Sequence, residues 1–388
     1  MPPSPSAPLI VVAPDSFKGS LSAPQASDAI ARGILRAIPS ADIRRCPMAD
    51  GGEGTLDAVL SVHGTRDSIH IANAAGIPTT SAIGQLDSAT GLIEVAQIVG
   101  LTDRNGTSLP VTHRTTSGVG EAILALLDRG CNKIFVALGG SSTNDAGAGL
   151  LTALGVRLLD KQGKPITPLP ENFAQVSTID ISGIDPRLAH CELIGMSDVD
   201  NPLTGSRGAT FVFGPQKGVA QHDLRHLDSS LTAFASKIED AFSRRCATLP
   251  GAGAAGGLGF AIMALGGTLV SGAGMVADLL RLDSLFANAD WVITGEGRTD
   301  EQTLSGKAPM IVAQRARNYG VPVTLLSGSV EVSALALANE HFSSCFSLVP
   351  GPMSLERAIQ DAETLLASQA EQLARLWMLS PSRPQWKT

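Results

Sequence analysis

The chain has 388 residues, which suits two domains better than one, and 44% of them are hydrophobic and 17% charged, as in a globular protein. The formal net charge of -7 argues against sequence-independent binding of nucleic acid, because such binding depends on neutralising phosphates. No run reaches the roughly 18–20 apolar residues of a membrane span. The five scattered cysteines argue against a disulfide framework and against a Cys-based zinc site.

The first residues, MPPSPSAP, lack the charged and apolar regions of a secretory signal. We therefore expect a cytoplasmic protein with neither a membrane nor a nucleic acid as partner. A homodimer is possible as an expectation, although no pattern in the sequence determines the oligomeric state.

Strand, turn and helix alternate over the first 64 residues. The apolar, β-branched run 9–13 predicts a buried parallel strand, and Ser22 predicts the cap of a helix that ends near residue 38. A short strand at 43–46 leads into a turn at 50–54, which holds three glycines and two carboxylates, and a further helix follows. This order is typical of the start of a doubly wound sheet.

The middle of the chain has a different texture. Residues 65–98 alternate and are rich in turns, which predicts antiparallel strands or a mixed sheet. Further strands are predicted at 133–138, 192–196 and 210–213. Helices are predicted at 117–128, from about 146 to 154, at 220–246 and at 256–266.

The α/β alternation returns near residue 288. Strands are predicted at 290–294, 321–326 and 345–349, and helices at 307–318, 332–339 and 354–377. Because this pattern matches the first one in kind, we predict one discontinuous α/β domain, residues 1–64 and 286–388. A second α/β domain, residues 65–285, would be inserted into it.

Five polar turns each follow a predicted strand, and in a doubly wound sheet such turns meet at the carboxyl ends of the strands, where ligands bind. They cover residues 15–18, 50–55, 139–145, 197–205 and 295–300. Their glycines offer backbone N–H groups to an anion. Their carboxylates would repel that anion unless a divalent cation lay between them. We interpret the set as an anion-and-metal site.

Other motifs are absent or out of context. Gly306-Lys307 lacks the remaining residues of a Walker A loop. Residues 251–256 satisfy G-x-G-x-x-G without a preceding strand, and a helix start able to hold a phosphate is the better interpretation. The histidines are dispersed, and we interpret the spaced pair His222 and His226 as a solvated helix face. The absence of a G-x-S-x-G elbow disfavours an α/β-hydrolase.

The chain resembles the bacterial glycerate kinase family, whose members carry glyoxylate- or galactarate-pathway names, in seven motifs that follow one another in the same order. These are APDSFKGSLSA (13–23), PMADGGEGT (47–55), LGGSSTNDAGAG (138–149), SDVDNPL (197–203), VFGPQKG (212–218), PGAGAAGGLG (250–259) and ITGEGRTDEQTLSGKAP (293–309). The resemblance runs from about residue 9 to residue 377. Departures are small: Ser142 and Ala146 stand where that family often has Ala and Gly.

The resemblance implies a fold and an activity. The fold would be two unlike α/β domains, one a discontinuous flavodoxin-like doubly wound sheet and the other an inserted domain that is restriction-endonuclease-like. The activity would be ATP-dependent phosphorylation of D-glycerate, usually at the 2-hydroxyl, giving 2-phospho-D-glycerate and ADP. ATP and Mg²⁺ would be the cofactors.

Phosphoryl transfer needs positioning, charge neutralisation and a group that orients the attacking hydroxyl. We expect catalytic roles for Asp198, Lys18, Asp50 and Lys307. Asp198 is favoured as the base because its turn has no adjoining glycine N–H groups. Magnesium ligands are expected to be Asp50, Glu53 and Glu296.

The remaining candidates are expected to bind substrate or nucleotide, through side chains such as Lys217 and Arg298 or through backbone N–H groups. They are Asp15, Ser16, Gly51, Gly52, Gly54, Thr55, Gly139, Gly140, Ser141, Asn144, Asp145, Asn201, Lys217, Gly295, Gly297, Arg298 and Asp300.

Three alternatives stay open. The product could be 3-phosphoglycerate, the acceptor could be another small hydroxy acid, or the chain could be a ligand sensor without turnover. Carboxylates among the glycine turns favour an enzyme, because a pure anion binder would gain little from them.

Overall fold

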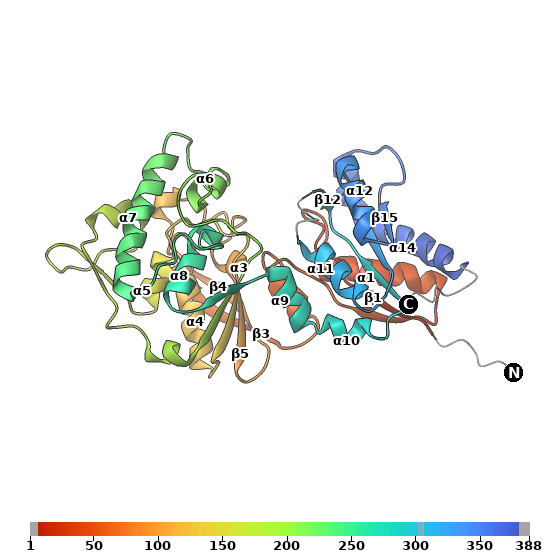
Figure 1. The fold of residues 1–388 in the computed structure, drawn as a ribbon, viewed down its shortest axis with the longest axis horizontal. Helices are drawn as coiled ribbons and strands as arrows, with labels where there is room; N and C mark the ends of the chain where they lie inside the picture. Colours follow the sequence, from red (N-terminus) through yellow and green to blue (C-terminus); the bar gives the residue numbers. More distant parts are fainter. Residues whose placement is uncertain (1–6, 302, 304–305, 380–388) are drawn as a thin grey trace. The chain divides into compact units, whose positions relative to one another are not determined.

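The computed structural model describes residues 7–301, 303 and 306–379, and the chain forms two compact units (Figure 1). The first unit comprises residues 1–50, 57–62 and 273–388, and the second comprises 51–56 and 63–272. The predicted boundaries, after residues 64 and 285, assign the segments 51–56, 63–64 and 273–285 to the other unit. The predicted N-terminal lead-in, up to residue 6, and the tail after residue 379 lie outside the described residues.

The first unit is built on a parallel sheet of five strands in the order β15-β13-β11-β1-β2. The strands are β1 (Leu9–Val12), β2 (Asp42–Arg45), β11 (Trp291–Thr294), β13 (Val323–Ser327) and β15 (Ser344–Ser347). Counted along this unit, the order is 2-1-3-4-5, which is the flavodoxin-like arrangement. The chain changes direction across the sheet between β1 and β11, and ligands bind beside such a switch point.

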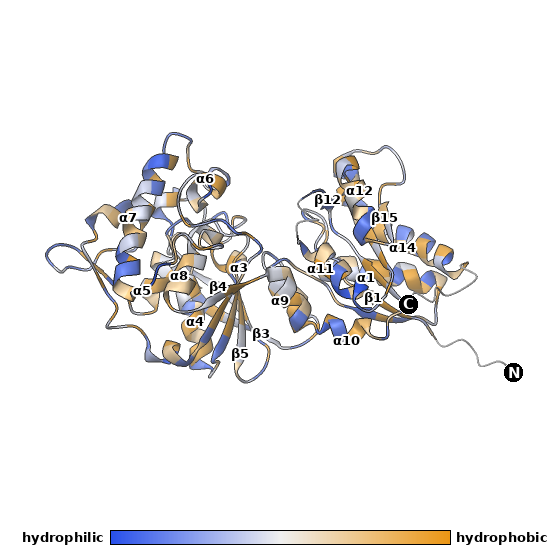
Figure 2. Cartoon of the chain, in the orientation of Figure 1, coloured by the Kyte–Doolittle hydropathy of each residue, from blue (hydrophilic) through white to orange (hydrophobic). Residues whose placement is uncertain are grey.

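Helices from both ends of the chain cover this sheet, and Figure 1 shows α1 beside α14. Ser22 caps α1 in a capping box with Gln25, as the sequence predicts. Gly33 lets the two helices approach closely, because a Cβ there would lie 2.1 Å from the Ala367 carbonyl oxygen. Both helices bury an apolar stripe and expose polar residues, which appear as alternating orange and blue in Figure 2.

The helices and short strands of this unit, including those that begin or end at its boundary, are listed here. They are α1 (Ala23–Ala37), α2 (Thr55–Leu60), α9 (Gly272–Leu279), α10 (Leu282–Phe286), β12 (Arg298–Thr299), α11 (Ala308–Arg317), β14 (Ser329–Val330), α12 (Val332–His341), α13 (Leu355–Gln360) and α14 (Ala362–Met378).

The second unit is built on a mixed sheet of six strands in the order β10-β9-β6-β5-β4-β3. The strands are β3 (Thr65–Ala72), β4 (Pro78–Gln85), β5 (Thr90–Glu94), β6 (Lys133–Ala137), β9 (Glu192–Met196) and β10 (Thr268–Val270). β3, β4 and β5 pair antiparallel, as the alternating texture predicts, whereas β5, β6, β9 and β10 are parallel. The carboxyl ends of these four strands therefore share one edge.

Helices and short segments surround this second sheet. They are α3 (Val95–Val99), η1 (Val111–His113), α4 (Ser117–Asp128), α5 (Ala148–Ala153), β7 (Arg157–Leu159), η2 (Pro170–Gln175), β8 (Thr178–Asp180), η3 (Pro186–His190), α6 (Ala209–Phe213), η4 (Pro215–Lys217), α7 (Leu224–Phe242), η5 (Ala254–Gly256) and α8 (Leu258–Ala264). Their apolar faces form one core with the sheet, in which the rings of Phe173 and Phe234 stack at 3.9 Å between centroids.

Two predicted elements are wrong. Residues 210–213 were expected as a strand because the run is β-branched and aromatic, but they belong to helix α6. The helix expected at 354–377 is two helices, α13 and α14, which meet at Asp361. Within the described residues, no helix is both long and apolar enough to cross a membrane.

Candidate active site

A pocket of about 780 Å³ opens in the first unit at the carboxyl ends of its parallel strands. Loops that follow β1 and β11 bring most of the predicted residues of this unit into its lining: Asp15, Ser16, Lys18, Glu296, Gly297, Arg298, Asp300 and Lys307. The pocket lies at the switch point of the sheet, which is where this arrangement of strands binds ligands.

Close backbone contacts at glycine residues hold these loops together. The Asp15 N–H donates to the Gly295 carbonyl at 2.8 Å, and a Cβ at Gly295 would lie 2.0 Å from the Leu326 carbonyl oxygen. A Cβ at Gly328 would lie 2.3 Å from the Gly297 carbonyl oxygen. A larger residue at either glycine would push the loops apart, so Gly295 positions the pocket through packing.

In this unit the carboxylate of Asp15 is affected by the negative charges of two other carboxylates, Asp50 and Glu296. Burial, then Asp50, then Glu296 raise the pKa of Asp15 to about 7, although the Ser16 N–H and Lys18 oppose the shift. Burial also raises the pKa of Glu296, against hydrogen bonds from Thr303 and Thr299. A buried carboxylate whose pKa is raised by neighbouring carboxylates, as that of Asp15 is, would be stabilised in its charged form by a cation.

Cationic side chains lie in the same lining. Lys18 is exposed, and Lys307 Nζ lies 4.0 Å from Asp300 Oδ1 with about a third of its side chain exposed. Arg298 forms an ion pair with Glu331, so its charge is already matched. Lys18 and Lys307 are therefore better placed than Arg298 to meet an anionic ligand.

The turn at 51–55 was expected to offer free N–H groups to an anionic ligand, but a carboxylate of the protein already accepts two N–H groups there. The buried carboxylate of Glu94, at the end of β5, accepts the N–H of Gly54 at 3.1 Å and the N–H of Leu56 at 2.9 Å. The Thr55 hydroxyl donates to the Gly52 carbonyl at 2.8 Å. Gly54 and Thr55 are thus engaged within the protein, and we no longer assign them to ligand binding.

Glu94 was missed by sequence reasoning. The sequence does contain a sign of its role: Glu94 is an acidic residue within the mostly apolar segment 92–99, and a buried charge needs hydrogen-bond partners.

Gly51 and Gly139 lie side by side at the strand-end edge of the second sheet. The Gly139 N–H donates to the Gly51 carbonyl at 3.0 Å, and a Cβ on Gly139 would lie 2.5 Å from the Gly52 Cα. Gly51 has φ +83°, and a Cβ there would lie 3.0 Å from the Met196 carbonyl oxygen. These glycines bring the turns after β6 and β9 against the 51–56 segment.

The loop after β6 turns into the interior. Asp145 is fully buried and accepts hydrogen bonds from the N–H groups of Thr116, Gly147 and Gly149 and from the Thr116 hydroxyl, at 2.8–3.2 Å. Burial raises its pKa against these bonds. Asp145 ties this loop to the start of α4, and we reassign it from ligand binding to that role.

Three further candidates are also held within the second unit. Lys217 is buried and donates from Nζ to Ser141 Oγ at 3.0 Å and to the Thr143 carbonyl at 2.7 Å. The buried Asn144 donates from Nδ2 to Thr210 Oγ1 at 2.9 Å. The structure therefore supports Lys217, Ser141 and Asn144 as a framework for the loop rather than as a surface for phosphate.

The turn after β9 presents Asp198 at an exposed position. Its Oδ1 accepts the Ser271 hydroxyl and the Gly272 N–H, both at 2.8 Å. The reason given for Asp198 from sequence is therefore wrong, because a glycine N–H distant in the chain does adjoin it. These donors orient the carboxylate. Asn201, in the same turn, donates to the Arg207 carbonyl at 2.7 Å.

A helix does start at the end of the segment 251–257, where Gly257 precedes α8, but the glycines of the segment pack against other loops. A Cβ at Gly256 would lie 2.1 Å from the Thr143 carbonyl oxygen, and a Cβ at Gly253 would lie 2.3 Å from the Pro202 carbonyl oxygen. The glycines permit close packing against these two loops, and most of the segment is buried.

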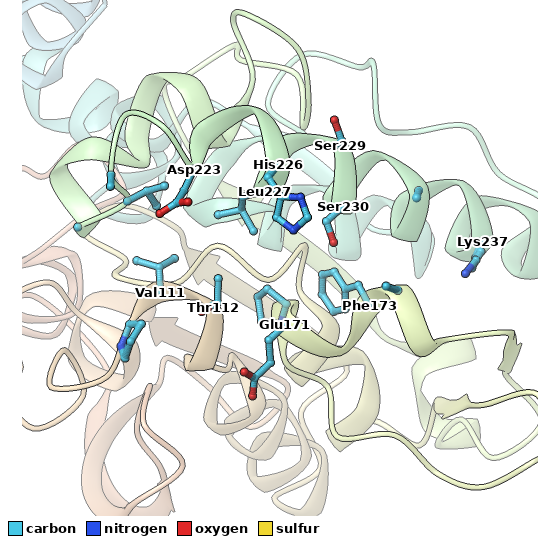
Figure 3. A pocket seen from close by; sticks show the side chains of 17 residues that line it. Val111, Thr112, Glu171, Phe173, Asp223, His226, Leu227, Ser229, Ser230 and Lys237 are labelled. Atoms are coloured by element: carbon cyan, nitrogen blue, oxygen red, sulfur yellow. The ribbon is translucent and has the colours of Figure 1, made fainter.

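A second cavity, of about 630 Å³, lies in the second unit (Figure 3). Helix α7 supplies one wall, with His226 and Ser230, and the η1 and η2 segments supply the other, with Thr112 and Phe173. None of the predicted site residues lines it. His226 is exposed, as expected of a solvated helix face.

Several carboxylates of the first unit are of the kind that bind magnesium. Among the residues that the structure describes, no three His, Cys, Asp or Glu side chains are grouped closely enough to hold a metal alone. Mg²⁺ is usually bound by one or two carboxylates together with substrate phosphates and water. Asp15, Asp50 and Glu296 fit that requirement, because the repulsion of Asp15 by the other two carboxylates would be relieved by a cation. Glu53 is exposed, where a carboxylate needs no cation, and we leave it out of the set.

Comparisons with known proteins identify the family of the chain. The model of the "Glycerate kinase family" matches residues 10–378. The chain is 42% identical over 373 residues to the glycerate kinase of Bacillus subtilis (strain 168), covering 94% of this chain and 96% of that protein. It is 38% identical over 356 residues to the glycerate 2-kinase of Escherichia coli (strain K12), covering 91% and 93%.

A solved structure is similar over the same length. The crystal structure from Salmonella typhimurium LT2, provisionally titled glycerate kinase 2, has a TM-score of 0.84 and 38% identity to this chain, and covers 96% of this chain and 98% of its own. The match of the family model across both units, together with these relatives, shows that the chain belongs to the glycerate kinase family.

Proposed function

We propose that this chain transfers the γ-phosphoryl group of ATP to D-glycerate, at the 2-hydroxyl, to give 2-phospho-D-glycerate and ADP. The observation that carries the proposal is the pocket at the switch point of the first sheet, where buried carboxylates and two lysines line one space. The named activity of the relative from E. coli, glycerate 2-kinase, supports the choice of hydroxyl.

We assign the carboxylates of Asp15, Asp50 and Glu296 to hold Mg²⁺ together with the phosphates of ATP. The bound ion would neutralise negative charge on the phosphates during transfer. Lys18 and Lys307 bind the phosphate oxygens from the same lining. Positioning and neutralisation of this kind supply most of the catalysis in phosphoryl transfer.

Asp198 is assigned to orient the attacking hydroxyl of glycerate and to accept its proton. Phosphoryl transfer demands little basicity of this group, because bond formation to the acceptor lags behind cleavage in a loose transition state. An aspartate held by Ser271 and Gly272 therefore suffices, since orientation matters more than a raised pKa. Exposed backbone at Gly140 offers an N–H to the carboxylate of glycerate.

We also infer a cytoplasmic location. All five cysteines are free thiols, which persist in a reducing compartment.

Phosphorus NMR of the product tests the reaction and its position together. Purified enzyme with ATP, Mg²⁺ and D-glycerate should give 2-phospho-D-glycerate, whereas 3-phosphoglycerate would leave the kinase but contradict the regiochemistry. A panel of small hydroxy acids with the same donor tests the acceptor. If another acid were much the better acceptor, the glycerate assignment would fail, and binding without ADP formation would point to a sensor.

A further inference from the structure

The residues that line the pocket of the first unit divide by chemistry into two sets, which we call its polar end and its apolar end. Its polar end carries the charged residues of the loops after β1 and β11. At the other end, every lining residue contributed by the chain after residue 347 is apolar. We call this end the apolar recess, lined by Val330, Leu348, Val349, Met353, Leu355 and Ile359.

The recess has a fixed floor and an exposed rim. Leu348 is buried, and its N–H donates to the Ser327 carbonyl at 2.8 Å, which fixes it beside β13. On α13, Leu355 is 71% exposed and Ile359 is 38% exposed, so the rim leaves apolar surface in water. A ligand that covered this rim would gain free energy in proportion to the apolar area removed from water.

The recess and the polar end belong to one site. The Ser20 hydroxyl donates to the Ile359 carbonyl at 3.0 Å, which ties α13 to the loop that carries Lys18. The pocket volume of about 780 Å³ lies within the roughly 300–1,000 Å³ of small-molecule sites. A single ligand could therefore present an apolar ring at one end and an anion at the other.

A small hydroxy acid has no apolar part with which to use the recess, whereas a nucleotide combines a flat ring with a polyphosphate. We propose that this pocket is the donor-nucleotide site and that the apolar recess holds the base. The inference deepens the proposed function and rests on it. The phosphates extend toward Lys18 and Lys307, and the base is retained by burial against apolar side chains.

The experiment measures the contribution of the base to binding separately from that of the phosphates. Leu355 is exposed at the first turn of α13, where an acidic side chain suits a helix N-terminus, so Leu355→Asp should keep the fold. Calorimetry with MgADP should show affinity lowered about tenfold or more in this variant, which corresponds to about 1.4 kcal/mol. Affinity for magnesium pyrophosphate, which has no base, should stay within about twofold. Leu376→Asp, at a leucine that is 62% exposed and outside the lining, is the matched control and should leave both affinities unchanged.

Steady-state kinetics supplies a second readout. The KM for ATP should rise in Leu355→Asp while the KM for glycerate stays the same. Unchanged MgADP affinity in Leu355→Asp, or an equal loss of pyrophosphate affinity, would overturn the base subsite. If the wild-type protein failed to phosphorylate glycerate while Leu355→Asp still lost MgADP selectively, the subsite would stand and the proposed function would fall.

Discussion

Lys217 brings an amino group into the interior of the second unit, where it holds the loop after β6. Burial lowers its pKa to about 7, although Asp145 opposes the shift. In the unfolded chain a lysine keeps a pKa of about 10.4. Between these values the unfolded state binds a proton that the folded state lacks, so stability increases as pH rises through this window and is lost as pH falls toward 7.

We therefore predict that the unfolding free energy of the wild type rises between pH 7 and pH 9, by at most about 1.4 kcal/mol per pH unit. Urea unfolding in reducing buffer measures it. Lys217→Met should flatten the rise, and Lys161→Met, at an exposed lysine, should keep it. Equal slopes in the wild type and Lys217→Met would show that the lysine is charged in the folded protein.

Substitution of Asp198 tests its proposed role as the group that accepts the proton of the attacking hydroxyl. Asp198→Asn preserves the shape of an exposed side chain but removes its negative charge, so kcat should fall by about 100-fold or more while the melting temperature stays the same. Asp200→Asn is the matched control, because Asp200 is exposed in the same turn and pairs with Arg207. Similar turnover in both variants would remove Asp198 from the mechanism.

At the scale of elements, the start of α2 depends on a carboxylate from β5. In Glu94→Gln, an amide NH₂ would replace one of the oxygens that accept the N–H groups of Gly54 and Leu56. We predict a loss of about 1–3 kcal/mol in unfolding free energy, together with lower kcat because the 51–56 segment loses its anchor. Urea unfolding and turnover assays measure the two effects. The exposed Glu53→Gln should change neither, and a Glu94→Gln protein equal to the wild type would show that the anchor is dispensable.

The periodic elements were predictable because local pattern and burial agree in them. The helix at 117–128 has the predicted bounds, and Ser22 caps α1 as expected. Residues 209–213 are β-branched and aromatic, yet they form α6, where the Thr210 hydroxyl accepts the amide of Asn144. Partners so distant in sequence override local propensity, and one sequence alone does not reveal them.

At the scale of the whole molecule, the sequence predicted which loops contribute to the site better than it predicted the role of each residue in them. Composition marked every polar turn, and the first unit does gather Asp15, Lys18, Glu296 and Lys307 in one pocket. Whether a turn faces a ligand or the interior depends on tertiary contacts, and for this reason Asp145 was assigned to a ligand although it is fully buried. The apolar recess was missed because its side chains carry no polar signal.

Removal of the metal tests whether the carboxylates of the pocket require a cation for the reaction. The chain has a formal net charge of -7 and clusters carboxylates beside the lysines of its pocket, so a polyphosphate would be repelled there without a cation. We predict that turnover vanishes in chelator-treated enzyme and returns with added Mg²⁺, and that Glu296→Gln raises the Mg²⁺ concentration needed for half-maximal rate. A coupled ADP assay measures both, with Glu340→Gln, at an exposed residue of α12, as the control. Persistent turnover in metal-free buffer would show that the lysines alone neutralise the phosphates, and the carboxylates would then need another explanation.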